Sequence, residues 1–430
     1  MLLQTDDQTM EDLRLFARRE QPGIYDIYNN TFTRGGEAVL EEMFRNPLSD
    51  REQIIARSSV IAAFAKLGTT FPFRPVLLDN IEKYLSQSAQ HRDGQRGTLG
   101  EKEIAAGVMA AIELLHAVRD FVEKGDAVKV EGLSQQRKNM TLLLQDEGLQ
   151  PVFNEKPGAK LSYAAITAYD ILVRVRERKK FIDVLHFIYL VDVYISVATM
   201  ANKHQFIFPV VHTGPGRVIN VQGVFHPALK APIGNDIRMD GQRSVVFLTG
   251  ANMAGKSTFL RSLSIAVYIA HMGFPVAAKA MEFSIMDGLY TTINLPDNLG
   301  IGASHFYAEV LRVKRIAVEL NAGRSIFVVF DELFRGTNVK DAHEGTVEIT
   351  RAFARKSNSL FIISSHIVEA ANTLKQQPTI GFYYLPTRMN GNTPEYTYTL
   401  QEGVTDDRHG MIIIRNENIL DILAAGKKNG

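Results

Sequence analysis

Residues 245–258 read Val-Val-Phe-Leu-Thr-Gly-Ala-Asn-Met-Ala-Gly-Lys-Ser-Thr, a short apolar run that leads into a glycine-rich turn. The spacing from Gly250 to Ser257 is that of a phosphate-binding P-loop between a buried strand and a helix. Gly250 and Gly255 let the backbone turn its N–H groups toward an anion, and the helix that follows directs its positive end to the same point. Lys256 adds a charge for the β- and γ-phosphates, and the Ser257 hydroxyl is a ligand for Mg²⁺. The sequence therefore predicts a site for a nucleoside triphosphate.

The composition is that of an ordinary globular protein. The chain has 430 residues, of which 45% are hydrophobic and 22% are charged, and this length fits two or three domains. The formal net charge of +1 gives no global basic signal for nucleic acid, so any such contact has to use a local patch. The sequence has no Cys, which excludes disulfides and thiolate metal sites and fits a reducing cytosol. We therefore expect a cytoplasmic protein.

No segment reads as a membrane span or a signal peptide. The most hydrophobic stretch, 181–201, contains Asp183, His186 and Asp192. Because charges are costly inside a bilayer, this stretch predicts a buried helix rather than a span. The N-terminus carries acidic residues where a signal peptide has basic ones. We expect no membrane partner.

The hydrophobic pattern of the sequence changes near residues 203–215. Residues 1–205 have helical periodicity and predict an all-helical domain, in which the charged stretch 126–162, with its Gly and Pro, reads as a loop or small insertion. From residue 206 onward, short apolar runs alternate with helical stretches, which predicts an α/β domain with a mostly parallel sheet over 206–430. The fold class is thus α + α/β. The expected strands are 244–249, 325–330, 359–364, 380–384 and 395–400.

Two of these strands are expected to end at chemically active side chains. Residues 325–330 lead into Asp331-Glu332, the form of a Walker B motif, in which the strand delivers an acid beside the phosphates. Asp331 is then expected to carry Mg²⁺ and Glu332 to activate the attacking water, the alternative being an acidic cap after a strand. Residues 359–364 lead to His366, which either contacts the γ-phosphate or the water, or is an ordinary satisfied polar residue. The order of the three strands favours the functional interpretation.

Two loops near these strands have two interpretations each. The glycine loop 298–303 enters a helix at Ser304, which either caps that helix or offers its hydroxyl to a nucleotide on another subunit, and both roles are compatible. Residues 335–338, Arg-Gly-Thr-Asn, read as a tight turn. The alternative is a loop that runs along a dimer interface to the partner's active site.

Together these motifs resemble the ATPase domain of the MutS family of DNA mismatch repair proteins. The matching stretches are 249–261, 302–306 with Glu309, 330–337 and 365–366, and His226-Pro227 with Asn235-Asp236-Ile237 is similar to the entry of that domain. Residues 7–16, 31–36 and 46–48 resemble the start of the family's core/lever domain, while 80–200 match in helical texture only. The resemblance therefore implies a core/lever domain over 1–205, followed by an ABC-type P-loop ATPase and dimerisation domain over 206–430.

The resemblance also assigns roles by motif position. It implies a Mg²⁺-dependent ATPase that works as a homodimer, in which the P-loop of one subunit binds ATP and Ser304 of the other reaches it. Ser257 and Asp331 are expected to hold the metal, and Lys256, Glu332 and His366 are the expected catalytic residues. The expected nucleotide-binding residues are Gly250, Ala251, Asn252, Met253, Ala254, Gly255, Lys256, Ser257, Thr258 and Ser304.

The chain departs from the family pattern at several positions. Ala251 and Ala254 stand where the family P-loop usually has Pro and Gly, Ala303 replaces a positive charge beside the signature serine, and Phe334 replaces a Gly after Walker B. We expect these changes to slow hydrolysis or alter dimer coupling without removing nucleotide binding. Because the sequence starts at the expected core domain, a mismatch-recognition domain and connector are expected to be absent, and the β-rich clamp absent or reduced near 126–162.

The sequence is compatible with two functions. The first is a MutS-like ATPase that acts on duplex or branched DNA in mismatch repair or recombination, with repair proteins as further partners. The second is an ATP-dependent dimeric switch that binds protein partners and has little DNA affinity, which the near-neutral charge favours. A transporter-type ABC subunit fits poorly because it has no place for the core/lever segment. The candidate DNA contacts, for which a solvated helix face is the alternative, are Arg137, Lys138, Arg174, Arg176, Arg178, Lys179 and Lys180.

Overall fold

The computed structural model describes residues 1–18, 21–87, 99–251, 253–293, 305–390, 393–405 and 418–425. The protein is a mixed helix-and-sheet structure, as predicted. It divides into two compact units. A helical unit contains Tyr25–Arg45 and Ile55–Gln205, and an α/β unit contains Met1–Ile24, Asn46–Ile54 and Phe206–Gly430.

The first residues of the chain belong to the α/β unit, which corrects the prediction that 1–205 form one helical domain. The backbone N–H of Gln4 donates to the carbonyl of Asp287 at 2.8 Å, and the N–H of Leu289 donates to the carbonyl of Gln4 at 2.9 Å. The N-terminal segment therefore lies along β6 (Gly288–Thr292), as an extra edge of the sheet. This pairing joins residues nearly 300 positions apart, so local periodicity carries no trace of it.

The helical unit is built around its longest helix, α10 (Arg178–His204). α10 packs against α3 (Arg34–Arg45), and buried Asp192 of α10 accepts hydrogen bonds from the N–H groups of Phe32 and Thr33 at 3.0 and 2.9 Å, just before α3 begins. The other elements of this unit are α2 (Ile24–Tyr28), which starts at the unit boundary, α4 (Arg51–Leu67), which crosses it, α5 (Pro75–Ser86), α6 (Glu101–Glu123), α7 (Ser134–Leu144), α8 (Gln150–Phe153), α9 (Tyr163–Ile171) and a π-helical turn (Leu172–Arg176).

The hydrophobic stretch predicted as a buried helix lies in α10. By length and composition α10 could cross a membrane, because its most apolar 18-residue window has a mean hydropathy of 1.8. However, 78% of that window is buried inside the protein. The burial fits a core helix, as the sequence predicts.

Residues 126–162 are mostly helical, which contradicts the loop interpretation of this stretch but not that of a small insertion. Two 3₁₀ turns (Asp126–Lys129 and Glu131–Leu133) lead into α7, and α8 follows. α7 and α8 both pack against α6, and buried Met140, Leu144 and Val152 supply apolar contacts. In the sequence, the many charged residues of this stretch hide the widely spaced apolar positions that form the buried faces of α7 and α8. The described residues 126–162 contain no β-strand.

The α/β unit contains a six-stranded sheet in the order β12-β9-β4-β8-β7-β6. Its pairs are parallel, except that β12 runs antiparallel to β9. The mostly parallel sheet predicted from residue 206 onward is therefore present. Besides β6, its strands are β4 (Val245–Gly250), β7 (Ile326–Phe330), β8 (Leu360–Ser364), β9 (Ile380–Leu385) and β12 (Gln401–Glu402).

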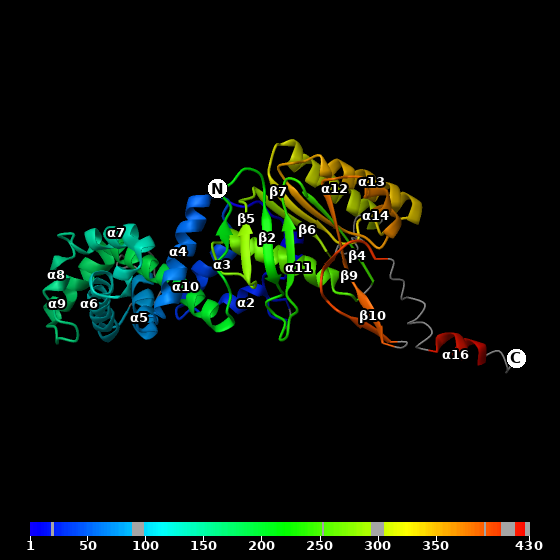
Figure 1. Ribbon diagram of the computed structural model, residues 1–430. Helices are drawn as coiled ribbons and strands as arrows, with labels where there is room; N and C mark the ends of the chain where they lie inside the picture. Colours follow the sequence, from blue (N-terminus) through cyan, green and yellow to red (C-terminus); the bar gives the residue numbers. More distant parts are fainter. Residues whose placement is uncertain are drawn as a thin grey trace. The chain divides into compact units, whose positions relative to one another are not determined.

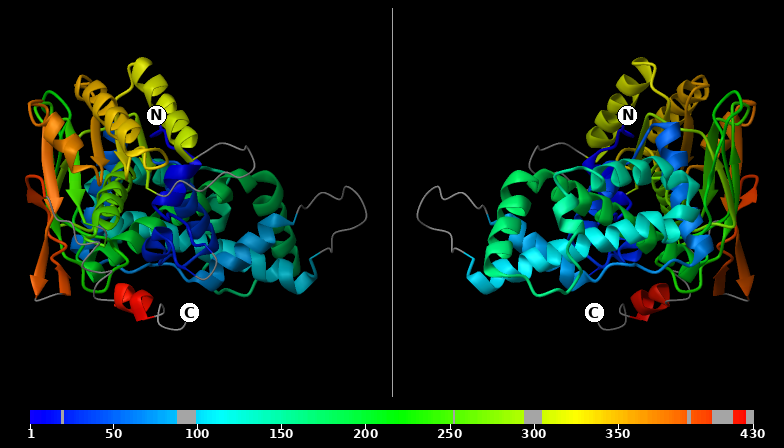
Figure 2. Two further views of the ribbon diagram at one scale, coloured as in Figure 1. Left: turned by 90° about the vertical axis from the view of Figure 1, so that its right-hand side faces the viewer. Right: turned by 90° about the vertical axis from the view of Figure 1, so that its left-hand side faces the viewer.

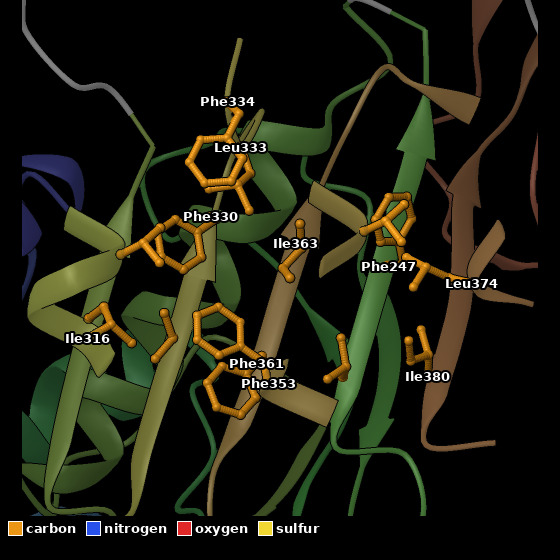
Figure 3. Packing of buried hydrophobic residues seen from close by; sticks show 14 of the residues in the cluster. Phe247, Ile316, Phe330, Leu333, Phe334, Phe353, Phe361, Ile363, Leu374 and Ile380 are labelled. Carbon is orange, nitrogen blue, oxygen red and sulfur yellow. The ribbon is translucent and has the colours of Figure 1, made fainter. Parts of the chain in front are cut away.

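One face of this sheet carries a continuous hydrophobic core under α12 (His305–Asn321), α13 (Val339–Ala354) and α14 (Val368–Leu374). Figures 1 and 2 show these three helices gathered on the same side of the sheet. Alternate strand residues point into the core, among them Phe247, Phe330 and Phe361, as the period of two requires. In Figure 3, Phe353 of α13 is close to Phe361, and their ring centroids are 4.5 Å apart. The helix α11 (Lys256–His271) contacts β4 and β6 but contributes no residue to this core.

A second sheet was not predicted. It has the order β1-β5-β2-β3, with β1 (Val210–Val211) parallel to β5 (Ala280–Phe283) and β2 (Ile219–Val224) antiparallel to both β5 and β3 (Asn235–Met239). A hairpin of β10 (Thr387–Asn390) and β11 (Thr393–Tyr396) takes the place of the expected strand 395–400. Two short helices, α1 (Asp7–Asp12) and α16 (Ile419–Ala425), complete the described elements.

Candidate nucleotide site

The carboxyl ends of three neighbouring parallel strands meet at the predicted site. β8 lies between β4 and β7, with Leu248 opposite Ser364 and Phe330 opposite Ile363. The turn after β4, the acids after β7 and the histidine after β8 therefore emerge at the same edge of the sheet. In open α/β sheets, this edge is where ligands bind.

The turn after β4 has the conformation that its glycines were expected to allow. Gly250 has a φ of 144° and Gly255 a φ of 99°, and Met253 between them also has a positive φ of 65°. A side chain at either glycine position would be strained in such a backbone. α11 starts at Lys256, and the N–H groups of its first turn have no acceptor within the helix. These N–H groups and the helix dipole suit an anion.

Lys256 is buried at the base of this turn, with an exposed fraction of 5%. Its Nζ donates to the carbonyl of Gly250 at 2.8 Å and to that of Ala251 at 3.1 Å. Burial lowers the pKa of Lys256, while the carboxylates of Asp331 and Glu332 act in the opposite direction. The ammonium group is therefore held inside the turn, close to the two acids that follow β7.

Asp331 directly follows β7, and two hydroxyl groups hold its carboxylate. Ser257 Oγ of α11 donates to Oδ2, and Ser364 Oγ at the end of β8 donates to Oδ1. The backbone N–H of Asp331 donates to the carbonyl of Thr292 at 2.9 Å. The two residues predicted to hold Mg²⁺, Ser257 and Asp331, thus lie in direct contact, and Ser364 is a third oxygen group that the sequence did not single out.

Glu332 has the left-handed backbone conformation, with a φ of 58°. Its N–H donates to Ser364 Oγ at 3.0 Å, and its Oε1 lies 2.6 Å from Nε2 of His366. Arg335 lies 3.6 Å from the other carboxylate oxygen. The hydrogen bond from His366 lowers the pKa of Glu332, against the effect of partial burial, which raises it. The structure therefore brings the predicted catalytic pair, Glu332 and His366, together.

Two predicted site residues, Asn252 and Ser304, lie outside the described residues. Ala251, Met253, Ala254 and Thr258 lie in the turn or in the first turn of α11, as their motif positions require. The stretch 335–338 ends at Asn338, whose side chain accepts a hydrogen bond from the N–H of Asp341 at 3.0 Å and caps α13. The tight turn predicted there is present.

Tyr398 is a site residue that the sequence interpretation missed. A Cβ placed on Gly255 would lie 3.0 Å from Cδ1 of Tyr398, so the ring lies directly against the P-loop turn. Asn235 fixes this segment, because its Nδ2 donates to the carbonyl of Tyr398 at 3.0 Å and its Oδ1 accepts from the N–H of Leu400 at 2.6 Å. Tyr398 is 45% exposed, and its ring has a flat apolar face. The tyrosines at 396 and 398 were its only signal in the sequence.

Most of the candidate DNA-contacting cluster at 174–180 is engaged within the helical unit. Arg174 is nearly buried and donates to both carboxylate oxygens of Asp170, and Lys180 pairs with Asp146 and Glu177. Arg178 donates to the carbonyl of Leu85 at 3.2 Å. Among the described residues, the side chains without such a partner are Arg137, Lys138, Arg176 and Lys179.

Comparisons with known proteins agree with the motif set. Residues 246–427 match the family described as MutS domain V. The chain is 27% identical over 230 residues to the DNA mismatch repair protein MutS of Fusobacterium nucleatum, which covers 52% of this chain and 25% of that protein. It is 26% identical over 256 residues to the DNA mismatch repair protein MutS of Persephonella marina, which covers 57% of this chain and 29% of that protein.

A third relative is the DNA mismatch repair protein MutS of Streptococcus uberis, 26% identical over 283 residues, or 61% of this chain and 33% of that protein. The matched segments thus span a third or less of the length of these relatives. The family match covers β4, the P-loop turn and the strands that carry Asp331 and His366. Residues 246–427 are therefore similar to MutS domain V, and about half of the chain is similar to part of these DNA mismatch repair proteins.

Proposed function

We propose that this protein is a Mg²⁺-dependent ATPase of the MutS type. The observation that carries the proposal is the pair of hydroxyl groups on Asp331, one from the P-loop helix and one from β8. This contact joins the three strand ends and leaves Lys256 and Glu332 beside the same carboxylate. Phosphoryl transfer to water needs three kinds of group: a P-loop with its lysine, a hydroxyl and an acid that hold a metal, and a base that activates the water. The site has a candidate for each of them.

The donor groups fit Mg²⁺. This ion prefers oxygen ligands and is usually bound through one or two carboxylates together with substrate phosphates. Ser257 and Asp331 would hold it, and Ser364 would orient the carboxylate. Among the described residues there is no cluster of three or more His, Cys, Asp or Glu side chains suited to a metal on their own. When bound with ATP, the ion would neutralise charge on the β- and γ-phosphates.

In this proposal each side chain of the site has its own role. Lys256 and the N–H groups of the P-loop turn bind the phosphates, and the Tyr398 ring offers a stacking face to the base. Glu332 orients the attacking water and accepts its proton, since its lowered pKa keeps it ionised near neutral pH. His366 holds the Glu332 carboxylate in place, and in this proposal it also senses the γ-phosphate.

In this proposal the protein works as a homodimer in the cytoplasm, and Ser304 of one subunit completes the nucleotide site of the other. ATP-driven changes in the dimer act on duplex or branched DNA in mismatch repair or recombination, together with repair proteins. The names of the relatives, which are DNA mismatch repair proteins, support this assignment. Arg137, Lys138, Arg176 and Lys179 are the basic side chains left for phosphate contacts.

A second candidate function is an ATP-dependent dimeric switch that binds protein partners and has little DNA affinity. The observation in its favour is that Arg174, Arg178 and Lys180 are engaged inside the helical unit. Their charge is therefore largely used by neighbouring acids and carbonyls. The net charge of +1 adds no general attraction for DNA.

Steady-state ATPase rates separate the two candidates. The purified protein is assayed alone and with homoduplex, mismatched and branched DNA, at low and at physiological salt. We expect stimulation by at least one DNA form, and this stimulation should weaken as salt rises because phosphate contacts release counterions. Turnover that no DNA alters would reject the DNA-directed function in favour of the protein-binding switch. Absence of turnover under every condition would reject the ATPase itself.

A further inference from the structure

Phe334 has a backbone conformation that phenylalanine rarely adopts. Its φ is 63°, and Glu332, two residues before it, has a φ of 58°. Such left-handed conformations are strained for residues other than glycine and persist only where the surroundings hold them. The Phe334 ring is buried, with an exposed fraction of 5%, and Figure 3 shows it beside Leu333 at the end of the core near Phe330. Packing of the Phe334 ring therefore helps to keep this residue in the strained conformation.

Two helices supply this packing. Phe306, in the first turn of α12, lies with its ring centroid 5.6 Å from that of Phe334, at an interplanar angle of 60°. On the other side, a Cβ placed on Gly345 of α13 would lie 2.9 Å from Cδ2 of Phe334, so the ring lies directly on the α13 backbone at this glycine. The ring is thus a wedge between α12 and α13.

Polar contacts hold the same turn to the same two helices. Glu309, one helical turn after Phe306, accepts a hydrogen bond from the N–H of Gly336 at 3.4 Å. Thr346 of α13 donates to the carbonyl of Leu333 at 3.3 Å. The residues on both sides of Phe334 therefore have fixed anchors, whereas Glu332 at the start of the turn carries the carboxylate that meets His366.

We propose that Phe334 is a positioning residue for Glu332: its ring, wedged between Phe306 and Gly345, keeps the turn in the conformation that aims the Glu332 carboxylate at His366. The proposal rests on the ATPase function proposed above. In this proposal Phe334, which lies between β7 and α13, supports hydrolysis, in contrast to the expectation from the sequence that its replacement of the family's Gly slows hydrolysis or alters dimer coupling. It also makes the rate of hydrolysis depend on the position of α12, through Phe306.

Two substitutions test the wedge directly. Phe334→Gly removes the ring and the backbone strain together, and Phe306→Leu removes the aromatic partner on α12. For each we expect kcat to fall about tenfold, because small displacements of catalytic groups are costly, while KM for ATP changes less than twofold. The fall in kcat at a nearly constant KM is the readout that distinguishes positioning of Glu332 from a role in nucleotide binding. A residue that only stabilises the core would lower the unfolding temperature without this fall in kcat.

Gly345→Ala is an independent test, because it acts on the Phe334 ring from the side of α13. The added methyl group displaces the ring, so kcat should fall in the otherwise unsubstituted protein. In the Phe334→Gly background the same methyl group meets no ring, so Gly345→Ala should have no further effect on kcat. Gly241→Ala, where a Cβ would meet nothing within 4 Å, is the matched glycine control.

Phe353→Leu is the control for general loss of core packing. Phe353 stacks on Phe330 and Phe361 in the same core, and its loss should lower the unfolding temperature but leave kcat within twofold. An unchanged or raised kcat in both Phe334→Gly and Phe306→Leu would overturn the proposal, as would an equal effect of Gly345→Ala with and without the ring. If the unsubstituted protein hydrolyses no ATP, both the wedge and the ATPase function are rejected. Hydrolysis with unaffected variants rejects the wedge alone.

Discussion

Nε2 of His366 lies 2.6 Å from Oε1 of Glu332, and this hydrogen bond joins the side chains that follow two neighbouring parallel strands, β8 and β7. The carboxylate oxygen accepts, so the imidazole donates from Nε2. This contact is the main reason why the pKa of Glu332 is below its ordinary value, because burial of the carboxyl group acts in the opposite direction. The pair therefore keeps the proposed base ionised and fixed in direction.

Removal of the imidazole should shift the pH dependence of hydrolysis. In His366→Ala the pKa of Glu332 rises, so the carboxylate becomes protonated at a higher pH and the acid limb of the kcat profile moves up in pH. The measurement is kcat from pH 4.5 to 8 at saturating ATP. His343→Ala, which removes a histidine of α13 that contacts Thr373, is the control. An acid limb that coincides with that of the unsubstituted protein would contradict the assigned role of His366.

Lys256→Ala should abolish nucleotide binding. The substitution removes the ammonium group that now lies 2.8 Å from the carbonyl of Gly250 and is the only charge of the P-loop turn placed for the phosphates within the described residues. We expect at least a hundredfold weaker binding of ATP, since charge-assisted contacts to phosphate are strong. Titration of a fluorescent ATP analogue measures the affinity, with Lys279→Ala, an exposed lysine of the same unit, as control. Equal affinity in the two variants would contradict the site.

Ser257→Ala should change the requirement for Mg²⁺. The Ser257 hydroxyl contacts the Asp331 carboxylate, and both are the proposed metal ligands. We expect the Mg²⁺ concentration for half-maximal hydrolysis to rise about tenfold, as for loss of one metal-orienting group. Hydrolysis is measured against Mg²⁺ at fixed ATP, and excess chelator should stop it. Ser264→Ala, which removes a buried hydroxyl elsewhere in α11, should leave the titration unchanged; a shift as large as that of Ser257→Ala would place the metal elsewhere.

The stability of the α/β unit should decline in mild acid because of His271. This residue is fully buried, its Nδ1 lies 2.7 Å from the carbonyl of Val267, and its Nε2 accepts from the N–H of Met286 at 3.0 Å. Burial lowers the pKa of His271 to about 4, below its ordinary value of 6.5. The stabilisation that neutral His271 provides is therefore complete above pH 6.5 and is lost as the pH falls toward 4, since the unfolded chain binds the proton first.

For one such histidine, the free energy of unfolding should fall by about 2 kcal/mol between pH 7 and pH 5. Denaturant titrations at the two pH values measure this difference. His271→Gln, which keeps a donor and an acceptor, should remove it, whereas His186→Gln on an exposed face of α10 should not. A difference that His271→Gln leaves in place would show that another group is responsible.

The site residues that could be predicted from the sequence are those whose functional group lies close in the chain to the strand that positions it. Lys256, Asp331 and His366 each follow a continuous apolar run within a few residues, so the strand and the functional group are read from the same short stretch. The parallel order of β4, β8 and β7 then brings them together without further information. Ser257 and Glu332 follow from the same local patterns.

The remaining features depend on contacts between distant segments. Asp12 of α1 accepts hydrogen bonds from the Thr291 hydroxyl and the Ile293 N–H, both at 2.8 Å, which places the N-terminal segment in the α/β unit. Nothing near Asp12 in the sequence signals a partner some 280 residues away. Tyr398 lies against the P-loop turn, and Asn235 of β3, more than 150 residues away in the sequence, holds its backbone. The conformation of Phe334 likewise depends on α12 and α13, and its local sequence predicts only a turn.

The most direct test of the account compares ATP turnover by the unsubstituted protein and by Glu332→Gln at saturating Mg²⁺ and ATP. Glutamine keeps the shape of the side chain but cannot accept the proton of the attacking water. We predict that the variant binds ATP as tightly as the unsubstituted protein and releases phosphate at least about a hundredfold more slowly, in line with loss of a general base. Equal rates of phosphate release by the two proteins would contradict the assignment of Glu332, and with it the catalytic site formed at the ends of β4, β7 and β8.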